Sequence, residues 1–231
     1  MGKVIFTQQT DRGVYNMIGG TVTYVADGQG EVKDKVVNIG LTLNTYNKEK
    51  KREEKQYLSV AFWNDEDPEK PQLADRVKRA KVRVGSFLFV RTGKITDTGR
   101  NANDGTPRLS AVGFDFQYNC KYEISAEEGQ RPYNILCGYA RNAEQRGEYY
   151  QVSIPVERRI NGDKETVWYA VSFADTEKNN IGTRASKVLQ NGTPVCILTG
   201  SITDKEGSNG TVYHNTRGFE FVCGFTQRAE A

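Results

Sequence analysis

Hydrophobic and polar residues alternate over much of the chain, in short runs that are separated by clusters of glycine, aspartate and asparagine. Alternation with a period of two is typical of β-strands that bury one face. In the first half of the chain it predicts five strands, over residues 14–25, 35–46, 56–64, 86–96 and 108–118. Between the third and fourth strands, Leu73, Val77 and Ala80 recur at helical spacing. They predict one short helix over 71–80, with Pro71 in its first turn, where proline fits.

The second half of the chain repeats this order of elements. Its predicted strands lie near residues 133–141, 149–159, 166–175, 193–203 and 211–222, with a helix near 181–190 in the same gap. Two motifs also return in order, Thr92-Gly93-Lys94-Ile95-Thr96-Asp97 as Thr199-Gly200-Ser201-Ile202-Thr203-Asp204 and Gly113-Phe114-Asp115-Phe116 as Gly218-Phe219-Glu220-Phe221. A repeat of about 110 residues is far longer than a solenoid or propeller unit, so the repeated unit is a whole small domain.

These patterns predict two domains, 1–122 and 132–231, joined by a short polar linker over 123–131. Five strands with one helix between the third and fourth is the element order of the OB-fold, a Greek-key barrel. The predicted fold class is therefore mostly all-β: two tandem five-stranded OB-fold barrels, each with one short helix between strands 3 and 4. The second and third strands of such a barrel form its usual binding face.

Large aromatic residues fall on the outward face of the predicted strands. If Leu58 and Phe62 point into the core, then Tyr57 and Trp63 point outward, because neighbouring side chains on a strand face opposite sides. The same argument places three further rings outside, at Tyr46, Trp168 and Tyr149. Trp168 stands in the second copy where Tyr57 stands in the first. Flat rings on a polar face suit stacking of unpaired bases, but exposed rings also mark protein interfaces, and both interpretations stay open.

Basic residues accompany these rings. A mixed-charge hairpin over 48–55 carries Lys51 and Arg52, and we expect it to reach over the binding face and contact phosphates. Further candidates for contacts with a nucleic-acid backbone are Arg91 and Lys94 on the fourth strand, and Arg158 and Arg159 in the second copy. The alternative is that these charges are ordinary solvated surface. The net charge is only +3, divided as +5 over residues 1–122 and −2 over 123–231.

Composition disfavours catalysis and metal binding. The four cysteines form no Cys-x-x-Cys pair, and His214 is the only histidine, so a multi-histidine metal site cannot be assembled from one chain. We therefore predict no metal, no cofactor and no enzymatic activity. The sequence also has neither a long apolar segment nor a secretory signal, so we expect a cytoplasmic protein without membrane contact.

Most of the first copy, and more faintly most of the second, resembles the bacterial and phage single-stranded DNA-binding protein family. The resemblance is carried by Ser59-Val60-Ala61-Phe62-Trp63, by Leu73-Ala74-Asp75 and by the segment from Gly85 to Thr96. It implies that Tyr57 and Trp63 match the stacking aromatic residues of the third strand, and that Trp168 matches the first of these in the second copy. The chain departs from the family in carrying two barrels rather than one. It also lacks the acidic C-terminal tail that recruits replication enzymes, so recruitment by that route is not expected.

Two hypotheses of function follow. The first is a non-catalytic, largely sequence-independent single-stranded DNA-binding protein that coats and protects exposed strand during replication, transfer or repair. The alternative is a duplicated OB-fold subunit that serves a replication or transfer complex as a structural or protein-interaction module, with little or no nucleic-acid binding. Single-stranded DNA is the expected partner, while RNA binding and assembly into a homo-oligomer stay open.

Overall fold

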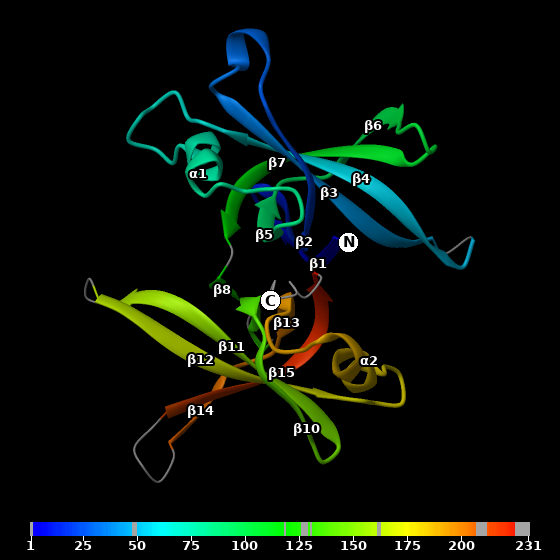
Figure 1. The fold of residues 1–231 in the computed structure, drawn as a ribbon, viewed down its shortest axis with the longest axis vertical. Helices are drawn as coiled ribbons and strands as arrows, with labels where there is room; N and C mark the ends of the chain where they lie inside the picture. Colours follow the sequence, from blue (N-terminus) through cyan, green and yellow to red (C-terminus); the bar gives the residue numbers. More distant parts are fainter. Residues whose placement is uncertain are drawn as a thin grey trace, which may run out of the picture. The chain divides into compact units, whose positions relative to one another are not determined.

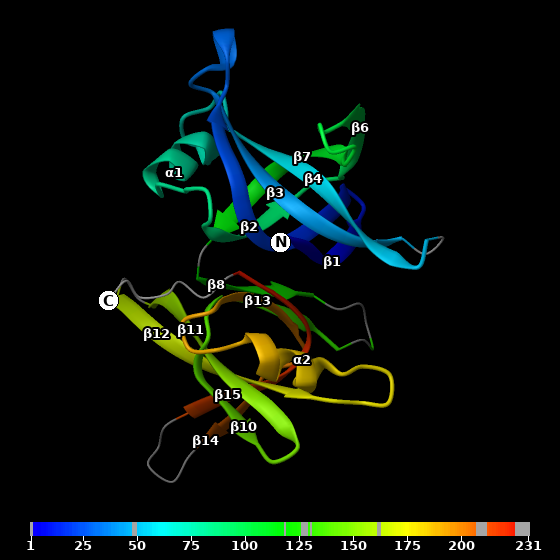
Figure 2. The ribbon, with the colours of Figure 1, turned by 45° about the vertical axis from the view of Figure 1, so that its right-hand side comes forward.

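The computed structural model describes residues 2–47, 50–117, 119–125, 129, 131–160, 163–206 and 212–224, without the side chains of Tyr46, Asn47, Arg159 and Ile160. The chain divides into two compact units, Met1–Gln117 and Tyr118–Ala231. Each unit is a β-barrel with one α-helix among its described residues (Figures 1 and 2). No helix in these ranges is long and apolar enough to cross a membrane.

The first unit contains seven strands, one α-helix and one 3-10 helix among its described residues. They are β1 (Lys3–Thr10), β2 (Gly13–Asp27), η1 (Gly30–Val32), β3 (Val36–Asn47), β4 (Arg52–Trp63), α1 (Leu73–Arg79), β5 (Phe87–Thr92), β6 (Thr96–Asn101) and β7 (Pro107–Gln117).

The long strand β2 closes the first barrel. Its residues 16–21 pair with β5, and its residues 22–27 pair with β3 on the other side. The remaining pairs run from β3 to β4, from β4 to β7 and from β7 to β5, and only the β4–β7 pair in this ring is parallel. This closed order is that of the OB-fold, which confirms the predicted fold class for this unit.

The core follows the predicted alternation. Leu58, Val60 and Phe62 of β4 are fully buried, and so are Ile39 and Leu41 on β3. The α1 helix buries Ala74 and Val77, which cover one end of the strands. The helix prediction was wrong in two details: the helix begins at Leu73 rather than near Pro71, and Ala80 is exposed because the helix ends before it.

The second unit repeats this architecture. Its elements are β8 (Cys120–Ile124), β9 (Tyr133–Tyr139), β10 (Arg141–Arg146), β11 (Tyr149–Ile160), β12 (Asp163–Ala174), α2 (Ile181–Val188), β13 (Pro194–Thr199), β14 (Thr203–Glu206) and β15 (Val212–Cys223). Here β9 and β10 together take the place of β2, since β9 pairs with β13 and β10 pairs with β11. The strands β12 and β15 are parallel, as β4 and β7 are.

The two copies share detailed contacts as well as topology. Phe62 meets Phe116 edge-on at 5.5 Å between ring centroids, and Phe173 meets Phe221 in the same way at 5.5 Å. A Cβ on Gly113 would lie 2.4 Å from the Phe62 ring, which explains why the repeated motif begins with glycine. The repeat read from the sequence is thus a duplication of one packing arrangement.

The boundary between the units differs from the predicted one. Strand β8 lies within the segments assigned to the first domain and the linker, yet it pairs with β9 over residues 120–124. It occupies the place in the second copy that β1 occupies beside β2 in the first. Each barrel therefore begins with an extra strand. The alternation of residues did not indicate β1 or β8, because β1 is rich in polar residues and β8 is short.

Candidate nucleic-acid interface

A groove of 1070 Å³ runs over the outer face of the first barrel. Residues of β2, β4, β6 and β7 line it, together with the turn between β6 and β7. Tyr57 projects into this groove from β4, as strand alternation predicts, because its neighbour Leu58 fills the core. Tyr24 lies on the same face and is partly exposed.

Tyr24 was not predicted as a site residue. Its ring covers Gly40 on β3, where an added Cβ would lie 2.0 Å from the ring. Glycine at that position therefore makes room for the flat side chain to lie along the sheet. The signal in the sequence was a glycine in the interior of a strand, between Asn38 and Thr42 on the outward face, a pattern that marks a close approach of other atoms to the backbone.

The turn between β6 and β7 brings charged residues into the first groove. Arg100 and Arg108 both line it, and Arg108 is the register partner of Tyr57 across the parallel pair. The Tyr57 hydroxyl donates a hydrogen bond of 3.1 Å to Oδ2 of Asp104. This bond raises the pKa of Tyr57, while hydrogen bonds from Thr106, and then from Tyr57, lower the pKa of Asp104. The Asp104 carboxylate is thus held beside the Tyr57 ring, which is accessible for stacking.

A second groove, of 950 Å³, occupies the corresponding face of the second barrel. Trp168 on β12 and Tyr213 on β15 line it with exposures of 48% and 50%, and Tyr149 on β11 adds a third ring. In the second unit Tyr169 of β12 pairs with His214 of β15, and in the first unit Leu58 of β4 pairs with Leu109 of β7 at the equivalent position. Trp168 therefore corresponds to Tyr57, and Tyr213 corresponds to Arg108.

The second groove has a different charge from the first. Its lining includes Glu144, Glu165 and Arg146, and Arg146 forms an ion pair with Glu144. Tyr213 was not predicted as a site residue, although the alternation of Val212, Tyr213 and His214 could have indicated it. The first groove is consequently richer in cations and the second richer in exposed rings.

Trp63 lies apart from both grooves. It is 44% exposed at the end of β4, opposite Val36, and it is six residues along the strand from Tyr57. At about 3.4 Å per residue this separation is roughly 20 Å. The structure therefore does not bring Trp63 and Tyr57 into one stacking surface, although both side chains are accessible.

The basic hairpin lies beside the first groove. Lys51 and Arg52 are exposed, and Arg52 approaches Glu54 at 3.5 Å. Arg52 also lines a smaller pocket of 530 Å³, which shares Asp104 with the first groove. Residues 48 and 49 lie outside the described residues, and so does the side chain of Tyr46, which was predicted to stack.

The other predicted cations lie elsewhere. The Arg91 guanidinium lies 5.0 Å from the centre of the Tyr15 ring, and Lys94 is exposed after β5. Arg158 lies 5.7 Å from the centre of the Tyr169 ring, beside a third pocket. None of these three residues is among the described residues that line the two grooves. The side chain of Arg159 lies outside the described part of the chain.

The described residues offer no metal-binding cluster. No group of three or more histidine, cysteine, aspartate or glutamate side chains within them could hold a metal ion. All four cysteines are free thiols, and burial raises the pKa of Cys137 well above its usual value. A protonated, buried thiol is a poor nucleophile, so Cys137 serves the core rather than chemistry.

Comparisons with known proteins find likeness in structure but not in sequence. No model of a protein family matches the chain, and no curated protein matches it. Among solved structures, the wild-type single-stranded DNA binding protein from Thermus aquaticus is 10% identical, with a TM-score of 0.29, over 94% of this chain and 95% of that one. A deletion mutant of that protein is 9% identical, with a TM-score of 0.29, over 94% of this chain and 97% of the mutant. The OB-fold of each unit is shown by the order and register of its own strands.

Proposed function

We propose that this protein binds single-stranded DNA without catalysis and with little sequence preference. The observation that carries the proposal is the pair of equivalent grooves, each on the outer face of an OB-fold barrel and each lined by exposed aromatic rings. OB-folds bind oligonucleotides on the face of their second and third strands. The third strand, β4 in the first unit and β12 in the second, lines both grooves, and the second strand, β11, also lines the second groove. Every base has a flat face, so rings of this kind bind strands of any sequence.

The two grooves contribute in different ways. In the first, Tyr24 and Tyr57 stack bases while Arg100 and Arg108 contact phosphates. In the second, Trp168 and Tyr213 provide most of the contact by stacking. Each stacked base contributes about 1 to 3 kcal/mol, and each cation that neutralises a phosphate makes binding more sensitive to salt. Such a protein would coat and protect exposed strand in the cytoplasm during replication, transfer or repair.

Tryptophan fluorescence tests this proposal, because the chain contains only two tryptophans. We expect oligothymidine to quench Trp168, which lines a groove, and to leave Trp63 largely unaffected. Trp63→Phe should therefore keep the quenching, and Trp168→Phe should abolish it. Unchanged emission in both variants, together with no gel shift at low salt, would exclude strand binding.

The alternative function is a structural or protein-interaction module, and one observation favours it. Glu144 and Glu165 line the second groove, and carboxylates there oppose a nucleic-acid backbone. If the isolated second unit bound neither DNA nor RNA while the first unit bound strand, the second groove would be assigned to a protein partner. Sedimentation of the full chain with and without oligothymidine would show whether a homo-oligomer forms.

A further inference from the structure

A third pocket, of 300 Å³, lies in the second unit and, among the described residues, shares only His214 with the stacking groove. Its lining comes from β8, β9, β11, β12, β14 and β15, and includes Tyr169 and His214. Tyr169 alternates with Trp168, which faces the groove, so Tyr169 points to the interior side of the sheet, whereas His214 lines both the pocket and the groove. The pocket is therefore a polar opening in the barrel wall or mouth, where small ligands commonly bind in barrels.

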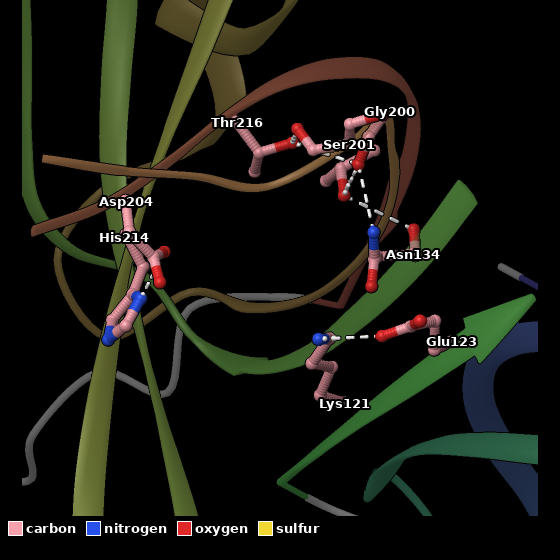
Figure 3. A network of polar contacts seen from close by, with 9 residues as sticks. Lys121, Glu123, Asn134, Gly200, Ser201, Asp204, His214 and Thr216 are labelled. Atoms are coloured by element: carbon pink, nitrogen blue, oxygen red, sulfur yellow. Dashed lines mark hydrogen bonds and ion pairs between the residues drawn. The ribbon is translucent and has the colours of Figure 1, made fainter. Parts of the chain in front are cut away.

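An unsatisfied acceptor lines this pocket. Asn134 is only 3% exposed, and its amide nitrogen donates to the carbonyl of Gly200 at 3.0 Å. That bond fixes which end of the amide is oxygen, and Oδ1 has no hydrogen-bond partner among the described residues. Figure 3 shows this oxygen directed away from Gly200, on the side of Lys121 and Glu123. A buried acceptor without a donor destabilises the folded protein, so a ligand that donates a hydrogen bond to Asn134 Oδ1 binds more tightly than one that does not.

The first copy provides an internal comparison. Asn16 makes the same bond to the carbonyl of Gly93, at 2.9 Å. Its Oδ1, however, accepts a hydrogen bond of 2.9 Å from the Thr7 hydroxyl. Thr7 is the register partner of Asn16 on β1, and Glu123 is the register partner of Asn134 on β8. A carboxylate has no proton to donate, so the second copy has replaced the internal donor with an acceptor.

Several donors surround the same pocket. The Lys121 ammonium lies 5.9 Å and the Arg158 guanidinium 5.7 Å from the centre of the Tyr169 ring. In the first copy the positions of Tyr169 and His214 hold Leu58 and Leu109. The second copy has therefore exchanged two apolar residues for a phenol and an imidazole.

Two carboxylates line the same pocket as these two cations. Glu123 pairs with Lys121 at 3.1 Å, and Asp204 lies 2.7 Å from Nδ1 of His214 (Figure 3). The Lys121 side chain is 16% exposed and the Glu123 side chain 65%, so the carboxylate is the solvated partner, and a more highly charged anion can displace it from Lys121. Asp204 engages the imidazole rather than either cation. Lys121 thus becomes available to a ligand that displaces Glu123, and Arg158 lies on the same pocket.

We propose that this pocket binds a nucleoside monophosphate unit. Its phosphate lies between Lys121 and Arg158, and a sugar hydroxyl or a base N–H group donates to Oδ1 of Asn134. Both requirements follow from the lining, since the cations need an anion and the buried oxygen needs a donor. A volume of 300 Å³ is at the lower end of ligand sites, which suits one nucleotide rather than a strand. The unit could come from a free mononucleotide or from the phosphorylated end of a strand.

The test is a titration of the full chain, followed by NMR of the tyrosine and histidine rings. Thymidine monophosphate should bind at least about tenfold more tightly than thymidine or inorganic phosphate, because only the nucleotide carries a donor far enough from its phosphate to reach Asn134 while the phosphate lies between the two cations. Lys121→Met and Arg158→Gln should each weaken nucleotide binding about tenfold. The matched control Lys187→Met removes an exposed cation on α2 and should leave binding unchanged.

A second variant tests the role of Asn134 separately from charge. Glu123→Thr restores the hydroxyl that the first copy has, so it should remove the advantage of nucleotide over inorganic phosphate. Comparing oligothymidines with and without a terminal phosphate then distinguishes a strand end from a free nucleotide as the source. No binding of nucleotide at low salt, or binding that Lys121→Met, Arg158→Gln and Glu123→Thr leave unchanged, would overturn the proposal. Because free nucleotide is the ligand, failure here is distinct from failure of strand binding.

Discussion

Single residues decide how the core of each barrel packs, and the glycines of the repeated motif are the clearest case. Gly113 lies against the Phe62 ring and Gly218 against the Phe173 ring, where an added Cβ would come within 2.4 Å and 2.3 Å. Both rings are fully buried and have further rings behind them, so neither can move aside freely. The glycines are needed for close approach rather than for unusual backbone angles.

We therefore predict that Gly113→Ala lowers the free energy of unfolding by about 1 to 3 kcal/mol, the usual cost of overpacking a core. Gly218→Ala should cost a similar amount in the second unit. Urea denaturation measures both. Ser110→Ala, at the rim of the first groove, is the matched control and should change stability little. If Gly113→Ala were neutral, the Phe62 ring would have more freedom than its contacts indicate.

Asp104 is the residue whose charge opposes the proposed function most directly. Its carboxylate accepts a hydrogen bond from Tyr57 within the first groove, where phosphates are expected. We predict that Asp104→Asn tightens binding of oligothymidine several-fold at low salt, because a negative charge is removed. Fluorescence titration measures the change. The control Asp11→Asn lies in an exposed turn outside the groove and should have a smaller effect.

The pH dependence of this effect follows from the lowered pKa of Asp104. A carboxyl group with a lowered pKa in the folded state stabilises the fold above its unfolded pKa, and this contribution is lost as pH falls through the folded pKa. Repulsion of phosphates is lost over the same range. The difference in affinity between the wild-type chain and Asp104→Asn should therefore shrink at acidic pH. An unchanged difference would mean that the carboxylate does not act by its charge.

At the scale of elements, strand alternation predicted much of the arrangement. It placed Leu58, Val60 and Phe62 in the core and Tyr57 and Trp168 on the grooves, because one face of each strand is buried. The helix between the third and fourth strands was also predicted, and the structure contains it in both units. Local periodicity was sufficient to predict whether a side chain is buried or exposed, because that depends only on which face of its own strand it occupies.

Alternation alone could not show which outward residues share a groove. Trp63 and Tyr57 occupy the same face of β4, but distance along the strand separates them. Arg108 lies beside Tyr57 because β7 pairs with β4, and Arg100 lies there because β6 pairs with β7. The pairing of β7 with β4 joins segments that are distant in the sequence. The sequence pattern indicated cations on the hairpin and the fourth strand instead. Contacts of this kind depend on register between distant segments, which one sequence does not reveal.

These arginines give the next prediction. If each contacts one phosphate, Arg100→Ala and Arg108→Ala should each reduce the slope of log affinity against log salt by roughly one. Oligothymidine titrations at several salt concentrations measure this slope. Arg12→Ala, in the exposed turn after β1, removes the same charge outside the groove and should leave the slope nearly unchanged. Equal effects of all three variants would indicate general attraction rather than contact.

At the scale of the whole molecule, duplication has produced two barrels with one topology and different surfaces. Register-equivalent positions hold Tyr57 and Arg108 in the first groove but Trp168 and Tyr213 in the second. The same divergence replaced Leu58 and Leu109 by Tyr169 and His214. The fold has tolerated these exchanges because the repeated asparagine, glycine and phenylalanine contacts keep each barrel closed.

The boundary between the barrels yields the last prediction. Strand β8 pairs with β9 and buries Cys120 and Ile124, so residues 118–231 form the complete second unit. A fragment that begins at residue 123 lacks most of this strand, including Cys120. We expect it to unfold with a free energy about 2 to 5 kcal/mol lower than that of fragment 118–231, by the loss of buried side chains and strand pairing. Urea denaturation of the two fragments measures the difference. Equal stability would show that the second barrel does not need β8.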